Sequence, residues 1–118
     1  MGYYIYIVRC ADNSHYTGIA AHLCHRMREH VEKLPGCARY TRSHPVVALD
    51  GLWRTEDRQK AARLEYAIKK LPKEKKLRLM EHPELLGTLL PQLAAEDYCA
   101  VMHVTLEMCL KGEVNHGD

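Results

Sequence analysis

The chain has 118 residues, of which 47% are hydrophobic and 27% charged, as in an ordinary soluble globular domain. No apolar run reaches the roughly 18 residues that span a bilayer. The first residues also lack the basic and apolar segments of a signal peptide. The five cysteines show no CxxC spacing. Their odd number indicates reduced thiols in a cytoplasmic protein rather than a disulfide framework.

The net charge of +2 is unevenly distributed along the chain. Residues 1–86 carry 16 basic and 10 acidic side chains, whereas residues 87–118 carry one basic and five acidic ones. A basic segment is typical of proteins that bind a polyanion, and an acidic segment predicts a different role. We therefore expect one domain over residues 1–86 and an acidic C-terminal extension over residues 87–118.

The first part of the chain predicts a hairpin and a helix. Residues 3–8 form an unbroken run of aromatic and β-branched side chains, typical of a strand buried on both faces. Turn residues at 12–14 and a short run at 15–18 complete the hairpin. Residues 20–34 have apolar side chains spaced by three and four, which predicts a helix that ends before Pro35.

The middle of the chain predicts a third strand at residues 46–53. Thr55 is a plausible N-cap of a helix that Pro72 ends after Leu71, and a basic helical segment follows at residues 73–81. This order predicts an α+β fold with a small three-stranded antiparallel sheet flanked by helices. Residues 89–110 fit a helix, and part of them also alternates like a strand. We expect the extension to be helical.

Three polar residues do not fit a purely structural interpretation. Glu65 lies within the apolar stripe of its helix, where it either reaches solvent at the edge or binds a hard divalent cation. Arg26 and His30 lie four residues apart on the first helix and share one flank. That flank is either a solvated face or part of a site.

Two further groups of residues have competing interpretations. The strand tyrosines, Tyr4, Tyr6 and Tyr16, can be packing residues, or their hydroxyls can move protons in a site. Histidines and cysteines are dense between residues 10 and 30, but their spacings match no structural zinc pattern. A zinc-stabilised interaction module is therefore the least favoured hypothesis.

Several segments together carry a family resemblance. They are Tyr4-Ile5-Tyr6, Tyr16-Thr17-Gly18, and residues 18–30, 36–42 and 61–71. In this order and spacing the chain resembles the GIY-YIG nuclease superfamily, and within it the small single-domain bacterial proteins. Tyr4 replaces the family's Gly, and Thr17 replaces its Ile. The resemblance covers residues 3–80 and implies a nuclease domain over residues 1–86, whereas the extension matches nothing in the family pattern.

The resemblance implies metal-dependent hydrolysis of DNA phosphodiester bonds. Glu65 would hold Mg²⁺ (or Mn²⁺), and Arg26 would contact the phosphate. Tyr6 and Tyr16 would converge on the attacking water, with Tyr6 favoured as the general base. His30 would orient a tyrosine or take part in proton transfer.

Basic residues predict a surface for the phosphate backbone. Tyr40 and Trp53 could stack on bases if they are exposed. With no second DNA-reading domain in the sequence, single-stranded or branched DNA is the favoured substrate, in repair, recombination or DNA processing. The alternative is a non-catalytic or weakly catalytic accessory module that acts with a partner protein. The extension could dock that partner, mediate self-association, or fold over the basic face and exclude non-specific DNA. The predicted DNA contacts are Arg39, Tyr40, Arg42, Arg63, Lys69 and Lys70.

Overall fold

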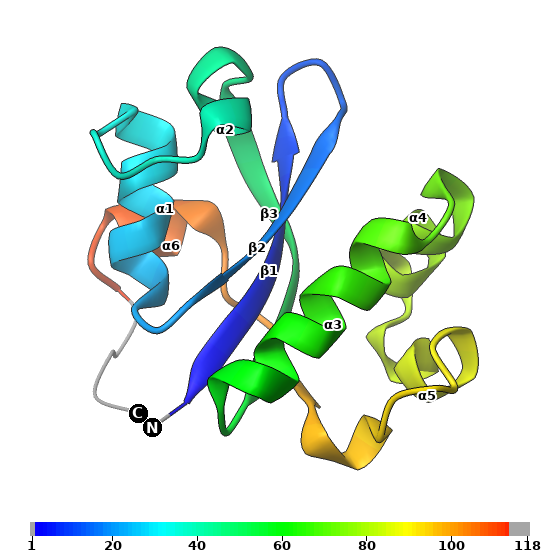
Figure 1. Cartoon of the computed structure of the whole chain (residues 1–118). Helices are drawn as coiled ribbons and strands as arrows, with labels where there is room; N and C mark the ends of the chain where they lie inside the picture. The colour runs from blue at the N-terminus through cyan, green and yellow to red at the C-terminus, as the bar shows by residue number, and fades with distance from the viewer. Residues whose placement is uncertain (1, 114–118) are drawn as a thin grey trace.

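The computed structural model describes residues 2–113, which form an α+β fold around an antiparallel sheet (Figure 1). The sheet has four strands in the order β2-β1-β3-β4. The α+β class is confirmed, but the prediction of three strands is wrong. The fourth strand comes from the extension, where the sequence alternates in part like a strand although a helix was expected, and it is only two residues long. The strands are β1 (Tyr3–Cys10), β2 (His15–Ala20), β3 (Val46–Thr55) and β4 (Cys99–Ala100).

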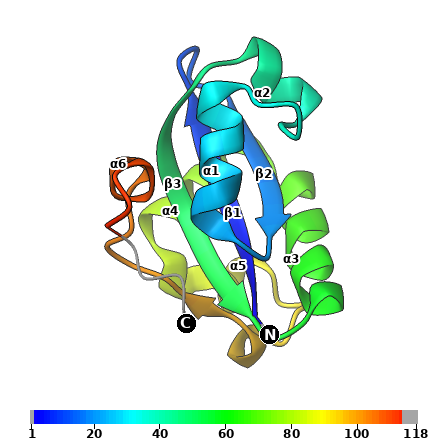
Figure 2. The same cartoon turned by 90° about the vertical axis from the view of Figure 1, so that its left-hand side faces the viewer.

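Helices pack on both faces of this sheet (Figure 2). None of the helices within residues 2–113 has the length and apolar character that a bilayer crossing requires. Two 3₁₀ turns, Pro83–Leu85 and Ala95–Asp97, accompany them. The helices are α1 (Leu23–Glu32), α2 (Arg39–Ser43), α3 (Arg58–Lys70), α4 (Lys73–Glu81), α5 (Leu86–Leu89) and α6 (Leu106–Leu110).

The central strand β1 divides the core into two layers. Ile5 and Ile7 belong to one apolar cluster, which contains the buried face of α3. Tyr6 and Val8 belong to the other cluster, which contains the buried face of α1. This is the alternation that the sequence predicts for a strand buried on both faces. It matters for the site because Tyr6 consequently points toward α1.

The start of α3 differs from the prediction. Thr55 is not the N-cap: it ends β3, and its hydroxyl donates a hydrogen bond to the Asp97 carbonyl at 2.9 Å. Asp57 caps the helix instead, since its carboxylate accepts from the Lys60 backbone N–H at 2.8 Å. Both residue types suit an N-cap. The strand runs two residues further than expected, and this decides between them.

The extension is not one long helix. It forms short turns and helices, and the chain passes from the α3 and α4 side to the α1 side (Figures 1 and 2). Leu90 belongs to the same core cluster as α3, and Leu106 belongs to the cluster of α1. Along the way β4 pairs with β3, and the Val101 N–H donates to the Leu52 carbonyl at 2.9 Å. The open edge of β3 thus offers backbone partners that a helix over these residues would forgo.

The prediction that the cysteines are reduced thiols is wrong for two of them. Cys24 of α1 and Cys109 of α6 form a disulfide across 85 residues of sequence. Cys10, Cys37 and Cys99 are free. The pair had no sequence signal, because helix packing rather than residue spacing brings the two side chains together.

Candidate active site

The first site feature is a chain of buried side-chain hydrogen bonds. The Tyr6 hydroxyl on β1 lies 2.7 Å from Nε2 of His30 on α1. Nδ1 of the same imidazole lies 2.7 Å from the Thr41 hydroxyl on α2. His30 and Thr41 are both 0% exposed. One imidazole therefore links a central strand to a second helix.

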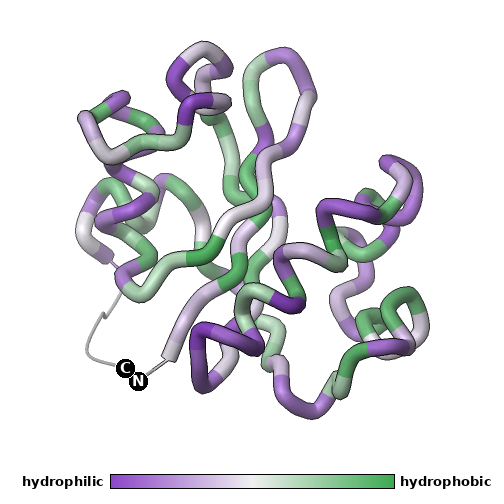
Figure 3. The backbone as a smooth tube through the Cα atoms, in the orientation of Figure 1, coloured by the Kyte–Doolittle hydropathy of each residue, from purple (hydrophilic) through white to green (hydrophobic). Residues whose placement is uncertain are grey.

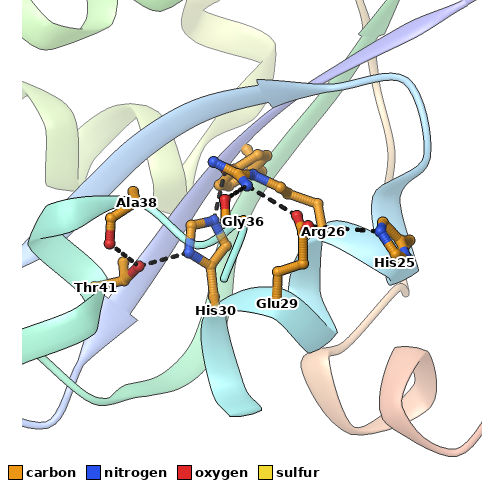
Figure 4. Close-up of polar contacts among 8 residues, drawn as sticks. His25, Arg26, Glu29, His30, Gly36, Ala38 and Thr41 are labelled. Carbon is orange, nitrogen blue, oxygen red and sulfur yellow. Dashed lines mark hydrogen bonds and ion pairs between the residues drawn. The ribbon is translucent and has the colours of Figure 1, made fainter. Parts of the chain in front are cut away.

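Arg26 extends this chain to the surface. Its Nε donates to the Tyr6 hydroxyl at 3.3 Å, and its Nη1 donates to the Glu29 carboxylate at 2.8 Å and to the Gly36 carbonyl. In Figure 4 the side chains of Arg26, Glu29 and His30 project from α1 toward the segment that carries Gly36 and Thr41. The guanidinium is thereby held in one orientation beside the phenol.

Charges around Arg26 keep it ionised. Partial burial acts to lower its pKa, but the hydrogen bonds to Glu29 and Tyr6 outweigh burial and place the pKa above its usual value. The same ion pair holds the Glu29 pKa below its usual value, chiefly through the hydrogen bond from Arg26. Arg26 is thus a permanent cation at the edge of the site.

Tyr6 and His30 are both uncharged at neutral pH. Burial raises the pKa of Tyr6 well above its ordinary value, although the hydrogen bond from Arg26 opposes the shift. Burial and, to a smaller extent, the Arg26 charge lower the pKa of His30 to about 4. The pair therefore consists of a phenol that holds its proton and an imidazole with a free lone pair.

Tyr16 joins the group from β2. Its ring centroid lies 6.5 Å from that of Tyr6 and 5.6 Å from that of His30. Gly18, paired with Tyr6 across the strands, makes the approach possible, because a Cβ there would lie 2.6 Å from Tyr6 Cζ. A larger residue at this position would push the phenol away from His30.

Glu65 reaches the same region from α3. Its carboxylate forms an ion pair with Lys69 Nζ at 3.3 Å. The same Nζ lies over the Tyr16 ring, 5.6 Å from the ring centroid. The Glu65 charge contributes to the raised pKa of Tyr6. Tyr6 thus lies against Tyr16, Arg26 and His30, and Lys69 connects Glu65 to the Tyr16 ring.

Glu65 is a single carboxylate rather than part of a ligand cluster. Within residues 2–113 there is no group of three or more His, Cys, Asp or Glu side chains that could hold a metal ion. Mg²⁺ usually keeps several waters and binds through one or two carboxylates. The partly buried Glu65 carboxylate therefore fits a hydrated Mg²⁺. Binding of the ion would displace the Lys69 ammonium from the carboxylate.

The predicted DNA contacts lie on two helices beside this site. Arg39 and Arg42 are exposed on α2, and Arg63, Lys69 and Lys70 are exposed on α3. Figure 3 shows hydrophilic residues along the outer side of α3 and along α4. Their exposure allows a polyanion to approach them, although Lys69 is also paired with Glu65.

The two aromatic residues proposed for stacking differ in exposure. Trp53 is 1% exposed and lies in the core, so it cannot stack on a base. Tyr40 is partly exposed, and its ring stacks on His44, at 3.9 Å and 3°, and lies 6.0 Å from the Tyr16 ring at 15°. Tyr66, which the sequence analysis did not single out, is 63% exposed on α3, with Lys70 Nζ 4.6 Å above its ring. It is the better placed aromatic.

Sequence reasoning missed two polar residues that contact the predicted site residues. Glu29 lies three residues after Arg26, and this spacing on a helix could have indicated an ion pair. Thr41 lies in a segment expected to be irregular, where a single hydroxyl has no distinguishing pattern. Its position became visible only through the contact with His30.

Most of the chain matches a known protein family. The model of the GIY-YIG catalytic domain matches residues 2–78. The chain belongs to the GIY-YIG family. The resemblance expected from the motifs is thus confirmed, and membership places the chain among nuclease domains that bind DNA. The matched residues include every candidate catalytic position, from Tyr6 to Glu65.

Bacterial GIY-YIG proteins are similar over most of the chain. The UPF0213 protein FN1575 of Fusobacterium nucleatum is 39% identical over 84 residues, 71% of this chain and 82% of that protein. The UPF0213 protein DP2720 of Desulfotalea psychrophila is 42% identical over 82 residues, 70% of this chain and 74% of that protein. The names of these proteins state no activity or substrate.

A solved structure also matches part of the chain. The solution NMR structure of the UPF0213 protein BH0048 from Bacillus halodurans is 33% identical. The match covers 76% of this chain and 97% of that one, with a TM-score of 0.45.

Proposed function

We propose that the chain is a metal-dependent endonuclease that hydrolyses DNA phosphodiester bonds. The observation that carries the proposal is the contiguous contact Arg26–Tyr6–His30 beside Glu65. It joins a fixed cation, a proton donor and a neutral base, and a carboxylate lies nearby. Hydrolysis of a phosphodiester needs these groups to stabilise charge and to move one proton.

Tyr6 is the proposed general base, acting as a proton relay. Because burial keeps its pKa high, a free phenolate is scarcely populated at neutral pH. The Tyr6 oxygen instead takes the proton of the attacking water while its own proton passes to His30 Nε2, 2.7 Å away. The neutral form of His30 above its pKa of about 4 leaves that nitrogen free to accept. Tyr16 would help to aim the water from the neighbouring strand.

Arg26 is the proposed phosphate ligand. A guanidinium can donate to two phosphate oxygens, and the ion pair with Glu29 fixes its orientation before substrate binds. A bound phosphodiester would also offset the positive charge that lowers the pKa of His30. Substrate binding would therefore make His30 a stronger base at the moment when a proton must move.

Glu65 is the proposed metal ligand. Bound there, Mg²⁺ or Mn²⁺ would stabilise the charge on the phosphate and on the leaving oxygen. Lys69 shares the carboxylate through a long, exposed side chain, so it can turn away without disturbing the helix. The metal ion would thus be held by α3, which packs on the opposite face of the sheet from α1.

The proposed substrate is single-stranded or branched DNA. The exposed cations on α2 and α3 supply phosphate contacts, which position a strand without reading its sequence. They border the site on the helices that carry Thr41 and Glu65. We expect salt to weaken this binding steeply, and we place the activity in repair, recombination or DNA processing.

The test offers the full chain labelled single-stranded, duplex and forked DNA, with Mg²⁺, with Mn²⁺ and with chelator. Metal-dependent cleavage supports the proposal. Salt-sensitive binding without cleavage contradicts it and favours the accessory module that acts with a partner protein. Repeating the binding assay with Arg42→Gln and Arg58→Gln separates the predicted interface on α2 from an exposed control arginine on α3.

A further inference from the structure

Thr41 is a fully buried hydroxyl with two partners. Its oxygen lies 2.7 Å from His30 Nδ1 and 3.2 Å from the Ala38 carbonyl oxygen (Figure 4). A carbonyl can only accept, so this contact uses the one hydroxyl proton of Thr41, beside the Arg42 N–H that donates to the same Ala38 oxygen at 3.1 Å. With its proton directed at Ala38, the Thr41 oxygen offers only lone pairs to His30, and this arrangement requires the imidazole proton on Nδ1.

The other side of the imidazole gives the same answer. With Nδ1 protonated, the neutral ring leaves Nε2 as an acceptor, so the Tyr6 hydroxyl donates to it. Arg26 Nε fills the role of donor to the Tyr6 oxygen. In the opposite tautomer both His30 and Arg26 would donate to Tyr6, and the buried phenol would need a new acceptor for its own proton. With Nδ1 protonated, the bonds instead run in a single direction, from Arg26 Nε through Tyr6, His30 and Thr41 to the Ala38 carbonyl.

We propose that Thr41 is a positioning residue that fixes His30 in the tautomer protonated at Nδ1, so that Nε2 receives the proton of Tyr6. The consequence for catalysis rests on the proposed function. In that reaction the water proton moves to the Tyr6 oxygen, the Tyr6 proton moves to Nε2, and the resulting imidazolium keeps its Nδ1–H bond to Thr41. With the other tautomer Nε2 has no lone pair, and the relay cannot run.

The test measures the tautomer directly, without DNA. Long-range ¹H–¹⁵N NMR of ¹⁵N-labelled full chain distinguishes protonated from unprotonated ring nitrogens, and His30→Gln identifies the His30 signals among the eight histidines. We expect wild type and Thr41→Ser to be protonated at Nδ1. Thr41→Val, which keeps the shape and removes the oxygen, should weaken that preference, because only the Tyr6 side then supports it. Protonation at Nε2 in wild type, or an unchanged tautomer ratio in Thr41→Val, would overturn the proposal.

Cleavage gives the second measurement. We expect Thr41→Val to cut DNA at least about tenfold more slowly and Thr41→Ser to restore most of the rate. Failure of Thr41→Ser to restore it, with the tautomer intact, would overturn the catalytic consequence. If wild type shows the expected tautomer and cleaves no DNA, the proposed function fails while the role of Thr41 toward His30 stands.

Discussion

The body of the chain, described for residues 2–86, and the extension, described for residues 87–113, contribute to the molecule in different ways. The body holds every proposed catalytic residue and the cations beside the site. The extension holds none of them, yet it contacts both helices that do. α6 is bonded to α1 through Cys24 and Cys109, and the Tyr98 hydroxyl donates to the Lys60 carbonyl on α3 at 2.7 Å. An acidic segment outside the family match thus braces the two helices that carry candidate site residues.

The charges of the extension support this interpretation. Asp97 pairs with Lys60 at 3.5 Å, and Glu107 pairs with Lys111 of the extension itself at 3.0 Å. Neither lysine belongs to the predicted DNA contacts. The difference between the two regions therefore predicts two kinds of variant: those in the body should lose activity, and those in the extension should lose stability.

The largest expected effect is a loss of cleavage rate in variants of the body. Tyr6→Phe removes the hydroxyl that joins Arg26 to His30, and Arg26→Ala removes the fixed cation. Each should lower the cleavage rate at least about tenfold, and general acid–base loss commonly reaches 10²-fold or more. Single-turnover cleavage measures the rate, and thermal unfolding checks the fold. Tyr3→Phe, on the opposite face of β1, should cleave normally, and an equal loss there would remove the distinction.

The next largest effect is a loss of unfolding free energy in variants of the extension. Leu106→Ala empties a buried position that packs against the α1 layer and should cost about 2–5 kcal/mol of unfolding free energy. Met102→Ala, at an exposed position, should cost little. Urea unfolding measures both. If Leu106→Ala is as stable as wild type, the extension does not brace the body.

Breaking the disulfide should also destabilise the chain. A bond across 85 residues restricts the unfolded state, and such bonds typically stabilise by about 2–4 kcal/mol. We expect Cys109→Ser to shift the urea midpoint downward, and added reductant to shift wild type in the same direction. Cys99→Ser removes a free, exposed thiol and serves as the control. Equal midpoints for wild type with and without reductant would contradict the bracing role.

The smallest effect is a pH dependence that originates in the body. The pKa of His30 is about 4 in the folded state, below its ordinary value of 6.5, because burial disfavours the imidazolium. The unfolded state therefore binds more protons between these values, so His30 contributes full stability above pH 6.5 and loses it as pH falls toward 4. The midpoint temperature of thermal unfolding should fall less steeply with decreasing pH for His30→Gln than for wild type. A parallel fall would show that His30 ionises freely in the folded chain.

The same two regions differ in how well the sequence predicts them. The hairpin and α4 follow from alternation, turn residues and helical spacing, and the faces of β1 are as predicted. β4 and the Cys24–Cys109 bond depend on contacts between residues far apart in the chain, which local patterns do not encode. The predicted start of α3 was wrong because Thr55 and Asp57 are both residue types that cap helices well. Only the length of β3 decides between them.

The site shows the same limit at the level of single residues. The motifs named Tyr6, Tyr16, Arg26, His30 and Glu65, and the fold brings the first four into contact. Thr41 could not be named in advance, because its importance comes from one hydrogen bond to a histidine on another helix. The catalytic roles of all these residues stay predictions.

The most direct test of the central claim is cleavage of a labelled single-stranded oligonucleotide by wild type and by Glu65→Gln. Glu74→Gln, which changes an exposed glutamate on α4, is the matched control. The account predicts cleavage by wild type and Glu74→Gln in Mg²⁺, none with chelator, and at least about a tenfold loss in Glu65→Gln with unchanged unfolding. Full activity in folded Glu65→Gln, or cleavage that persists in chelator, would contradict it.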